Sequence, residues 1–172
     1  MADLTNQERL QPSLLDRLTD DEPHKTVESR DKRVLSLNRL RDSVMRDLAW
    51  LLNTGCLAQL EDLEDYPEVQ HSVLNYGMID LAGGMLSSTD VKAVEKSLKQ
   101  ALLDFEPRIN RDTLRIRVTK ADDVMNKNAV TFHIQGELWA QPVPLRLFLK
   151  TDVDIETGNV RVTDEDGRVV EA

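Results

Sequence analysis

The chain has 172 residues and a formal net charge of −9 at pH 7, and only 4% of its residues are aromatic. This length suits one domain with an aliphatic core, while the acidic balance argues against nucleic acid and anionic membranes, both of which attract Lys and Arg. A single cysteine excludes an internal disulfide. The polar N-terminus lacks the apolar core of a signal peptide, and no stretch approaches the ~20 apolar residues of a membrane span. We therefore expect a cytoplasmic protein without direct membrane insertion.

Residues 1–32 are predicted to form an extended arm with one short helical turn. Ser13 is a suitable N-cap for that turn, and Leu14, Leu15 and Leu18 give it an apolar face. The arm is either a disordered tail or a docking arm whose leucines insert into a groove of a partner. The remaining residues, 33–172, are expected to form a single domain.

A long amphipathic helix is predicted from about residue 31 to residue 53, where Asn53-Thr54-Gly55 is a typical C-terminal stop. Its polar face is basic and includes Arg39 and Arg46. On an acidic chain such a face can bind an acidic partner. Alternatively, its arginines pair with nearby aspartates on a solvated surface, which is common on helices and is the interpretation we favour.

The middle of the chain is predicted to be an acidic connector over residues 57–68, followed by a short helix that Pro67 can open and that runs to about residue 75. The carboxylates of the connector do not match a calcium loop in spacing or in turn glycine. A second long helix follows, with Ser88 or Thr89 as its cap, and its apolar residues recur at helical spacing up to Phe105.

Alternating apolar residues predict strands near 112–119, 130–139 and 145–155, with a returning strand near 160–162. Residues 156–159 read as a hairpin turn, and Asp166-Gly167 as a second turn. The predicted fold class is α+β: two long helices and short helices packed on one face of a small, mainly antiparallel sheet of three to four strands.

The junction between the second helix and the first strand is the most informative local feature. Pro107 explains the change of pattern, because it lacks a backbone donor and its ring pushes the preceding residue toward extended geometry. Residues two apart in an extended chain point the same way. We therefore predict that Glu106 and Arg108 form a fixed pair of opposite charges, which either closes an edge of the core or binds a partner.

The order of elements, in which a helix is followed by Glu106-Pro107-Arg108 and then by a small sheet, is similar to that of the baseplate wedge family of contractile injection machines. That family includes a phage tail baseplate protein and the TssE subunit of bacterial type VI secretion. Three further segments resemble the TssE branch, at residues 12–18, 41–53 and 66–83. The resemblance covers most of the chain, from Pro12 to about Phe148, with its pieces in the right order.

The resemblance implies a structural wedge subunit that binds other wedge proteins, of the TssF, TssG and TssK type, and contractile sheath subunits, and that helps to nucleate sheath assembly. Members of this family resemble the terminal domain of sheath subunits, whose strands add to neighbours by main-chain pairing, and a small sheet leaves edges that can accept a strand. Combined with the residue patterns above, the predicted partner-binding residues are Glu106, Pro107, Arg108, Leu14, Leu15, Leu18, Arg39 and Arg46.

An enzyme is the alternative, since phage relatives of this family have carried a lysozyme-like label. Glycoside hydrolysis needs two carboxyl groups about 5 to 9.5 Å apart, and Glu106 is the candidate acid. Arg108 beside it favours the ionised carboxylate, whereas a general acid has to carry a proton. His24, His71 and His133 occur in unrelated contexts without a nucleophile motif. We therefore expect no catalytic residue, no metal and no cofactor.

Overall fold

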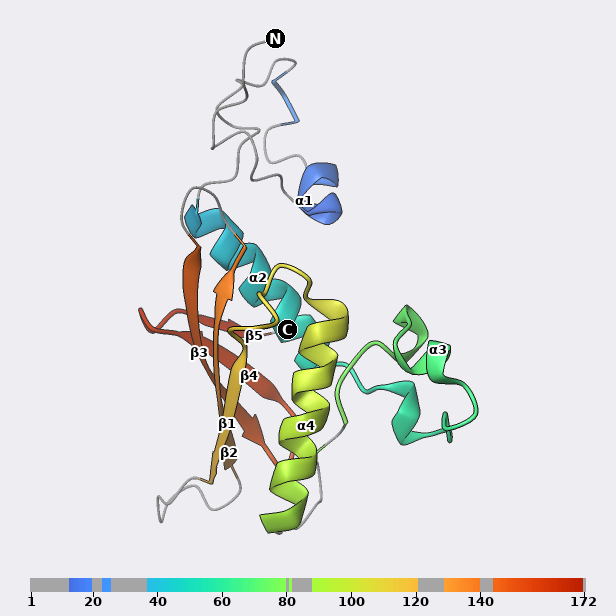
Figure 1. Ribbon diagram of the computed structural model, residues 1–172. Coiled ribbons are helices and arrows are strands. Elements are labelled where there is room, and N and C mark those ends of the chain that lie inside the picture. Colours follow the sequence, from blue (N-terminus) through green and yellow to red (C-terminus); the bar gives the residue numbers. More distant parts are fainter. Residues whose placement is uncertain are drawn as a thin grey trace.

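The computed structural model describes residues 13–19, 23–25, 37–79, 81, 88–120, 129–139 and 144–171. Its helices are α1 (Leu14–Leu18), α2 (Leu37–Leu52), α3 (Pro67–Gln70) and α4 (Ser88–Phe105), with short 3₁₀ helices η3 (Leu57–Gln59) and η4 (Val73–Asn75). Its strands are β1 (Arg115–Lys120), β2 (Ala129–Leu138), β3 (Leu145–Asp154), β4 (Val160–Asp164) and β5 (Val169–Glu171). Helices and sheet combine as expected for the α+β class (Figure 1).

The sheet corrects the predicted number of strands. It has five strands in the order β1-β2-β3-β4-β5, with every neighbouring pair antiparallel, and not three to four. The additional strand, β5, has three residues and pairs with β4 after a turn at Gly167. Three residues are too few to show the alternation by which a strand is recognised in a sequence.

Each consecutive pair of strands is joined along the chain, so the sheet is a meander. The turn predicted at residues 156–159 is present, because the Gly158 N–H donates to the Asp154 carbonyl at 2.8 Å and the Asp154 N–H donates to the Asn159 carbonyl at 3.0 Å. Gly158 adopts a φ of +74° there, which a residue without a Cβ tolerates best.

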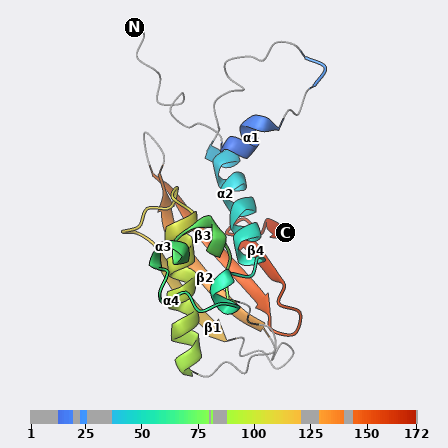
Figure 2. The same ribbon diagram turned by 90° about the vertical axis from the view of Figure 1, so that its right-hand side faces the viewer.

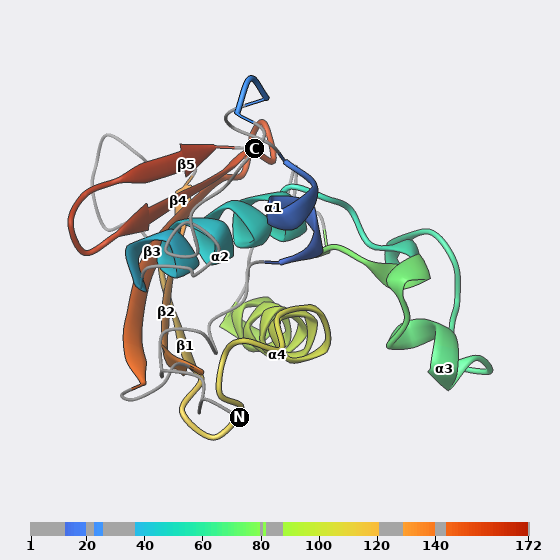
Figure 3. The same ribbon diagram turned by 90° about the horizontal axis from the view of Figure 1, so that it is seen from above.

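The two long helices lie on the same face of the sheet, inclined to each other, and the sheet curves around them (Figure 3). α2 contacts β4 and β5, while α4 contacts β1. The core between them is almost entirely aliphatic, as the composition predicts. Its fully buried members include Val44, Leu48, Leu98, Leu102 and Ile134. Alternation in β3 places Leu147, Leu149 and Val153 in this core.

Between the two long helices the chain makes an excursion, defined here as residues 57–75, which carries η3, α3 and η4. It extends on the side of the helices away from the sheet, and Figure 2 views the molecule from that side. The single short helix predicted for residues 67–75 is divided in two, because α3 ends at Gln70 and η4 begins at Val73.

The N-terminal arm is described only in part, at residues 13–19 and 23–25. The other residues of the predicted arm, and the predicted start of the first long helix at residues 31–36, lie outside the described residues. The division into an arm (1–32) and a single domain (33–172) therefore stays a prediction.

Candidate partner-binding site

The proline corner, residues 106–108, follows directly on the last residue of α4. The Glu106 N–H donates to the last turn of α4 at 3.0 Å, and the Ile109 N–H donates to the Glu106 carbonyl at 3.2 Å. A third bond ties the corner to the end of β2, because the Trp139 N–H donates to the Arg108 carbonyl at 2.7 Å. The backbone of the corner is thus fixed to both the helix and the sheet.

The two charged side chains of the corner bind each other through a two-pronged contact. Arg108 Nε lies 2.6 Å from Glu106 Oε1, and Arg108 Nη2 lies 2.5 Å from Glu106 Oε2. The Arg108 N–H also donates to Oε1 at 3.1 Å. The Glu106 carboxylate is buried, with 3% of its side chain exposed against 24% for Arg108. Part of the guanidinium of the corner is therefore exposed to solvent, whereas almost none of its carboxylate is.

Helix α2 supplies two more partners for the same guanidinium. Arg108 Nη2 donates to Asp47 Oδ2 at 2.6 Å, and Nη1 donates to the Ser43 hydroxyl at 3.1 Å. The Ser43 hydroxyl in turn donates to a backbone carbonyl one turn earlier, at 3.0 Å. Burial opposes the charge of Arg108, but the hydrogen bonds and charges of Glu106 and Asp47 outweigh it and raise the pKa of Arg108.

Asp47 extends the network to the short helix α1. Its Oδ1 accepts from Arg46 Nε at 3.0 Å and from Arg46 Nη2 at 2.8 Å. Arg46 Nη1 in turn donates to Asp16 Oδ1 of α1 at 2.5 Å. On the other side of Asp16, Ser13 Oγ donates to Oδ2 at 2.7 Å and accepts from the Asp16 N–H at 3.3 Å. Ser13 is therefore the N-cap of α1, as predicted.

The contact between α1 and α2 has a clear electrostatic signature. Burial is the largest influence on Asp16 and acts to raise its pKa. The hydrogen bonds from Arg46 and Ser13, together with the Arg46 charge, outweigh burial and hold the pKa of Asp16 below its ordinary value of 3.8. The hydrogen bond that Arg46 donates to Asp16 is the main cause that raises the pKa of Arg46. The Arg46 guanidinium also lies 5.2 Å from the centre of the Trp50 ring.

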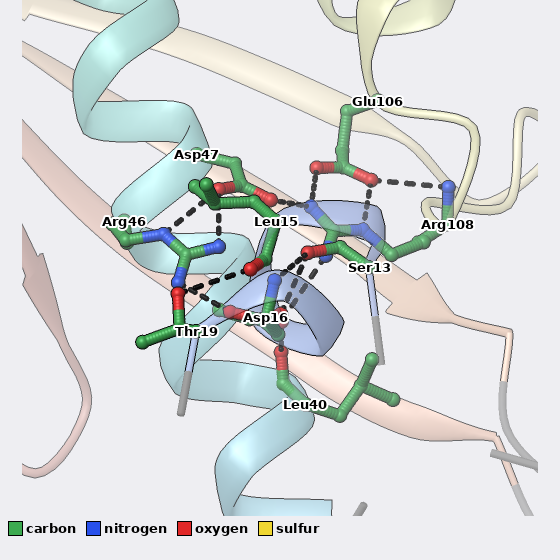
Figure 4. Close-up of polar contacts among 10 residues, drawn as sticks. Ser13, Leu15, Asp16, Thr19, Leu40, Arg46, Asp47, Glu106 and Arg108 are labelled. Carbon is green, nitrogen blue, oxygen red and sulfur yellow. Dashed lines mark hydrogen bonds and ion pairs between the residues drawn. The ribbon is translucent and has the colours of Figure 1, made fainter. Parts of the chain in front are cut away.

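Three carboxylates and two guanidiniums thus alternate from α1 through α2 to the proline corner: Asp16, Arg46, Asp47, Arg108 and Glu106. Figure 4 shows this charge network, in which Asp47 lies between the two arginines. Charge-assisted hydrogen bonds of this kind are strong and directional. The network therefore fixes the orientation of the corner relative to α2 and holds α1 on α2.

A hollow of about 380 Å³ adjoins the network, between α1, α2 and the corner. Its apolar lining includes Trp50, Leu51, Tyr76, Phe105 and Pro107, and its polar lining includes both charged residues of the corner. Tyr76 and Phe105 meet edge to face, with ring centres 5.2 Å apart. Burial, followed by the nearby Asp47 and Glu106 charges, raises the pKa of the Tyr76 hydroxyl.

The other predicted partner-binding residues are leucines of α1 and arginines of α2, and they differ in exposure and in their contacts. Leu14, Leu15 and Leu18 are all exposed on α1. Arg39 is exposed at the start of α2. Arg46 binds two carboxylates of its own chain. Neighbouring charges on α2 are also paired, as Arg41 with Asp166 and Asp42 with Arg168. Both partners lie in the turn between β4 and β5, whereas the solvated-face interpretation expected pairs with aspartates of the same helix, of which Arg46 with Asp47 is an example.

Sequence reasoning did not identify Ser43, Asp16 or Tyr76 as parts of the site. A signal for Ser43 was present, because it lies four residues before Asp47 and thus on the same face of α2. Asp16 gave no such signal, since its partner Arg46 is thirty residues away in the chain. Tyr76 belongs to a segment that resembled TssE, but the resemblance did not indicate its neighbours.

Within the described residues, no group of three or more His, Cys, Asp or Glu side chains is arranged to hold a metal ion. Among the described helices, none combines the length and the apolar character that crossing a membrane requires.

Comparison with protein families shows a match to the model described as "Baseplate wedge protein gp25" over residues 38–143. The matched region begins at the second residue of α2, ends two residues before β3 and contains the whole proline corner, whereas α1 and its leucines lie outside it. Searches of curated proteins and of solved structures give no significant match. Because the matched region covers more than half of the chain, the chain belongs to the baseplate wedge protein gp25 family, of which TssE is a member.

Proposed function

We propose that this chain is a structural baseplate subunit of a type VI secretion machine, acting in the cytoplasm. Membership of the baseplate wedge family supports a structural role in a baseplate and contacts with other baseplate proteins. The segments that resemble TssE favour a secretion system over a phage tail. In this proposal the partners are wedge proteins of the TssF, TssG and TssK type and contractile sheath subunits, and the chain helps to nucleate the sheath.

The charge network around the proline corner is the observation that carries the proposal. A joint between large subunits has to keep its shape under load, and the corner is held by the two-pronged contact between Glu106 and Arg108 and by Asp47. We propose that a partner docks on a surface formed by the exposed part of Arg108, Pro107 and the adjoining hollow. A pre-organised surface of this kind loses little conformational entropy when it binds.

Arg108→Ala tests this role in cells that assemble the sheath. We expect sheath formation to be lost. Since the variant is also less stable, Leu147→Ala serves as a matched control, because truncating this buried core residue of β3 costs a comparable ~2–5 kcal/mol. Sheaths at the wild-type frequency in Arg108→Ala cells, or equal loss in both variants, would contradict a specific role of the corner.

The exposed leucines of α1 are proposed as a second anchor, with Arg39 and Arg46 on the helix beneath. A Leu14→Ser/Leu18→Ser double variant leaves the charge network intact, so we expect normal stability but reduced co-purification with the other baseplate proteins. Deleting residues 1–20 is expected to have the same effect on co-purification while leaving the domain folded. Unchanged co-purification in both variants would remove α1 from the proposal, and loss of folding on deletion would place the arm in the core.

A hydrolase is less well supported than a structural role. Arg108 donates to both oxygens of Glu106 and only 3% of the Glu106 side chain is exposed, so this carboxyl group is engaged by its own chain and is out of reach of a glycan. Incubation of the pure protein with peptidoglycan tests the point. Release of sugar fragments by the wild type but not by Glu106→Gln would favour the enzyme.

A further inference from the structure

The excursion at residues 57–75 is held firmly at its base. The Cys56 N–H donates to the Met78 carbonyl at 3.1 Å, and the Met78 N–H donates to the Thr54 carbonyl at 2.8 Å. The strand-like contact between Gly55 and Met78 therefore brings the two ends of the excursion together. Gly77 completes the closure with a φ of +133°.

Hydrogen bonds also order the interior of the excursion. The Asn75 side chain joins both halves, because its Oδ1 accepts from the Ala58 N–H at 2.8 Å and its Nδ2 donates to the Gln70 carbonyl at 2.9 Å. Gln70 in turn donates from its side chain to the Leu63 carbonyl at 2.8 Å. Pairing of His71 Nδ1 with an Asp104 oxygen at 2.8 Å connects the excursion to α4. The excursion is thus a built element with a defined shape.

This ordered element nevertheless leaves large apolar side chains in water. Leu60, Tyr66, Val73 and Leu74 are 81%, 60%, 80% and 68% exposed. They lie on or beside η3, α3 and η4, short helices that contact one another. Single exposed apolar residues are ordinary on a protein surface, but several on one protrusion with a polar surround are typical of a binding surface.

The ionisable side chains around these apolar residues are all acidic apart from one histidine, and the other polar residues of the excursion are neutral. Residues 57–75 contain no Lys or Arg and carry five exposed carboxylates, namely Glu61, Asp62, Glu64, Asp65 and Glu68. In the part of the chain that the structure describes, none of these five forms an ion pair. The negative charge of the excursion is therefore uncompensated, in contrast to the paired charges on α2.

The negative charge of the excursion determines which kind of partner can bind it. A second copy of the chain would bring the same carboxylates and an overall charge of −9, so like charges would oppose contact. Nucleic acid and anionic membranes would be repelled for the same reason. A protein surface with an apolar centre and a rim of Lys and Arg would bury the four apolar side chains and neutralise the carboxylates.

We propose that the excursion is a docking surface for a protein partner whose contact face is apolar at the centre and basic at the rim. None of its four apolar residues lines the hollow beside the proline corner. The proposal therefore adds a separate interface to the one assigned above.

A photo-crosslinking residue at position 73 of the full chain, in cells that make the native machine, tests this interface. We expect crosslinks to map to an apolar residue of a partner protein that is surrounded by Lys and Arg. A Glu61→Lys/Glu64→Lys variant should lower the crosslink yield at least about tenfold, and replacing the facing Lys or Arg of the partner with Glu should restore it.

The control variant is Asp112→Lys/Glu165→Lys, which changes the net charge equally at two exposed positions away from the excursion and should leave the yield unchanged. Crosslinks mapping to another copy of this chain or to a non-basic surface, a yield insensitive to charge reversal, or no crosslink at all would overturn the proposal. The yield reports on the excursion alone, so this result is independent of whether Arg108→Ala prevents sheath assembly.

Discussion

Removal of the Arg108 side chain is the sharpest test of the charge network. Only 3% of the Glu106 side chain is exposed. Of the three hydrogen bonds that Glu106 accepts from Arg108, the Arg108→Ala variant keeps only the one from the backbone N–H. Breaking a buried ion pair by removing one partner costs about 3–5 kcal/mol. Because 24% of the Arg108 side chain is exposed to water, which weakens the interaction, we expect the lower end, ~3 kcal/mol.

Urea unfolding followed by circular dichroism measures this loss. In a chain of this size a loss of ~3 kcal/mol corresponds to a fall in Tm of about 6–12 °C. Arg111→Ala is the matched control, because its exposed guanidinium makes a single long contact of 3.4 Å to a backbone carbonyl. Its free energy of unfolding should change by no more than about 0.5 kcal/mol.

A double-mutant cycle with Glu106→Gln measures the interaction energy between Arg108 and Glu106 apart from the interactions that each makes with other residues. The Glu106→Gln substitution replaces the carboxylate with a neutral amide, so the double variant leaves no uncompensated charge at this position. The double variant should therefore lose less stability than the two single variants added together, with a coupling energy of about 1–3 kcal/mol. A loss below about 0.5 kcal/mol in Arg108→Ala, or additive single effects, would show that the network does not stabilise the fold in the way argued here.

Two further predictions concern the base of the excursion and the attachment of α1. A Cβ on Gly77 would lie 2.4 Å from a backbone oxygen at a φ of +133°, so Gly77→Ala should lower the free energy of unfolding by more than about 2 kcal/mol. The control variant Gly55→Ala should cost less than about 1 kcal/mol, because nothing lies within 4 Å of a Cβ at that position. Equal effects of the two variants on Tm would refute this prediction. Because the folded-state pKa of Asp16 is lowered, its ion pair with Arg46 is fully present above pH 3.8 and is lost as the pH falls below that value. The fluorotryptophan NMR signal of Trp50, over which Arg46 lies, should shift in that acidic range in the wild type, and an identical shift in Asp16→Asn would rule out this assignment.

The sequence by itself determined the elements whose cause is local. Helical spacing located α2 and α4, and alternation located β1 to β4, because each pattern repeats over enough residues to define one buried face. Pro107 determined where α4 ends. The extended chain expected after it is instead a turn, in which the Ile109 N–H donates to the Glu106 carbonyl at 3.2 Å, so the sequence predicted the contact between Glu106 and Arg108 but not its backbone geometry. The family was also recognisable at this stage, since it rests on the order of such local segments.

Only the tertiary structure decided which of many charged and polar groups meet. With 31 acidic and 22 basic residues, charge alone could not select Asp16 for Arg46 or Asp47 for Arg108. Asn53 shows the same limit: it ends α2 as predicted, yet its side chain also exchanges two hydrogen bonds with the backbone of Val160, 107 residues away. Such pairs depend on how the packed helices and sheet orient their surfaces, because long polar side chains carry no periodic pattern that specifies a distant partner.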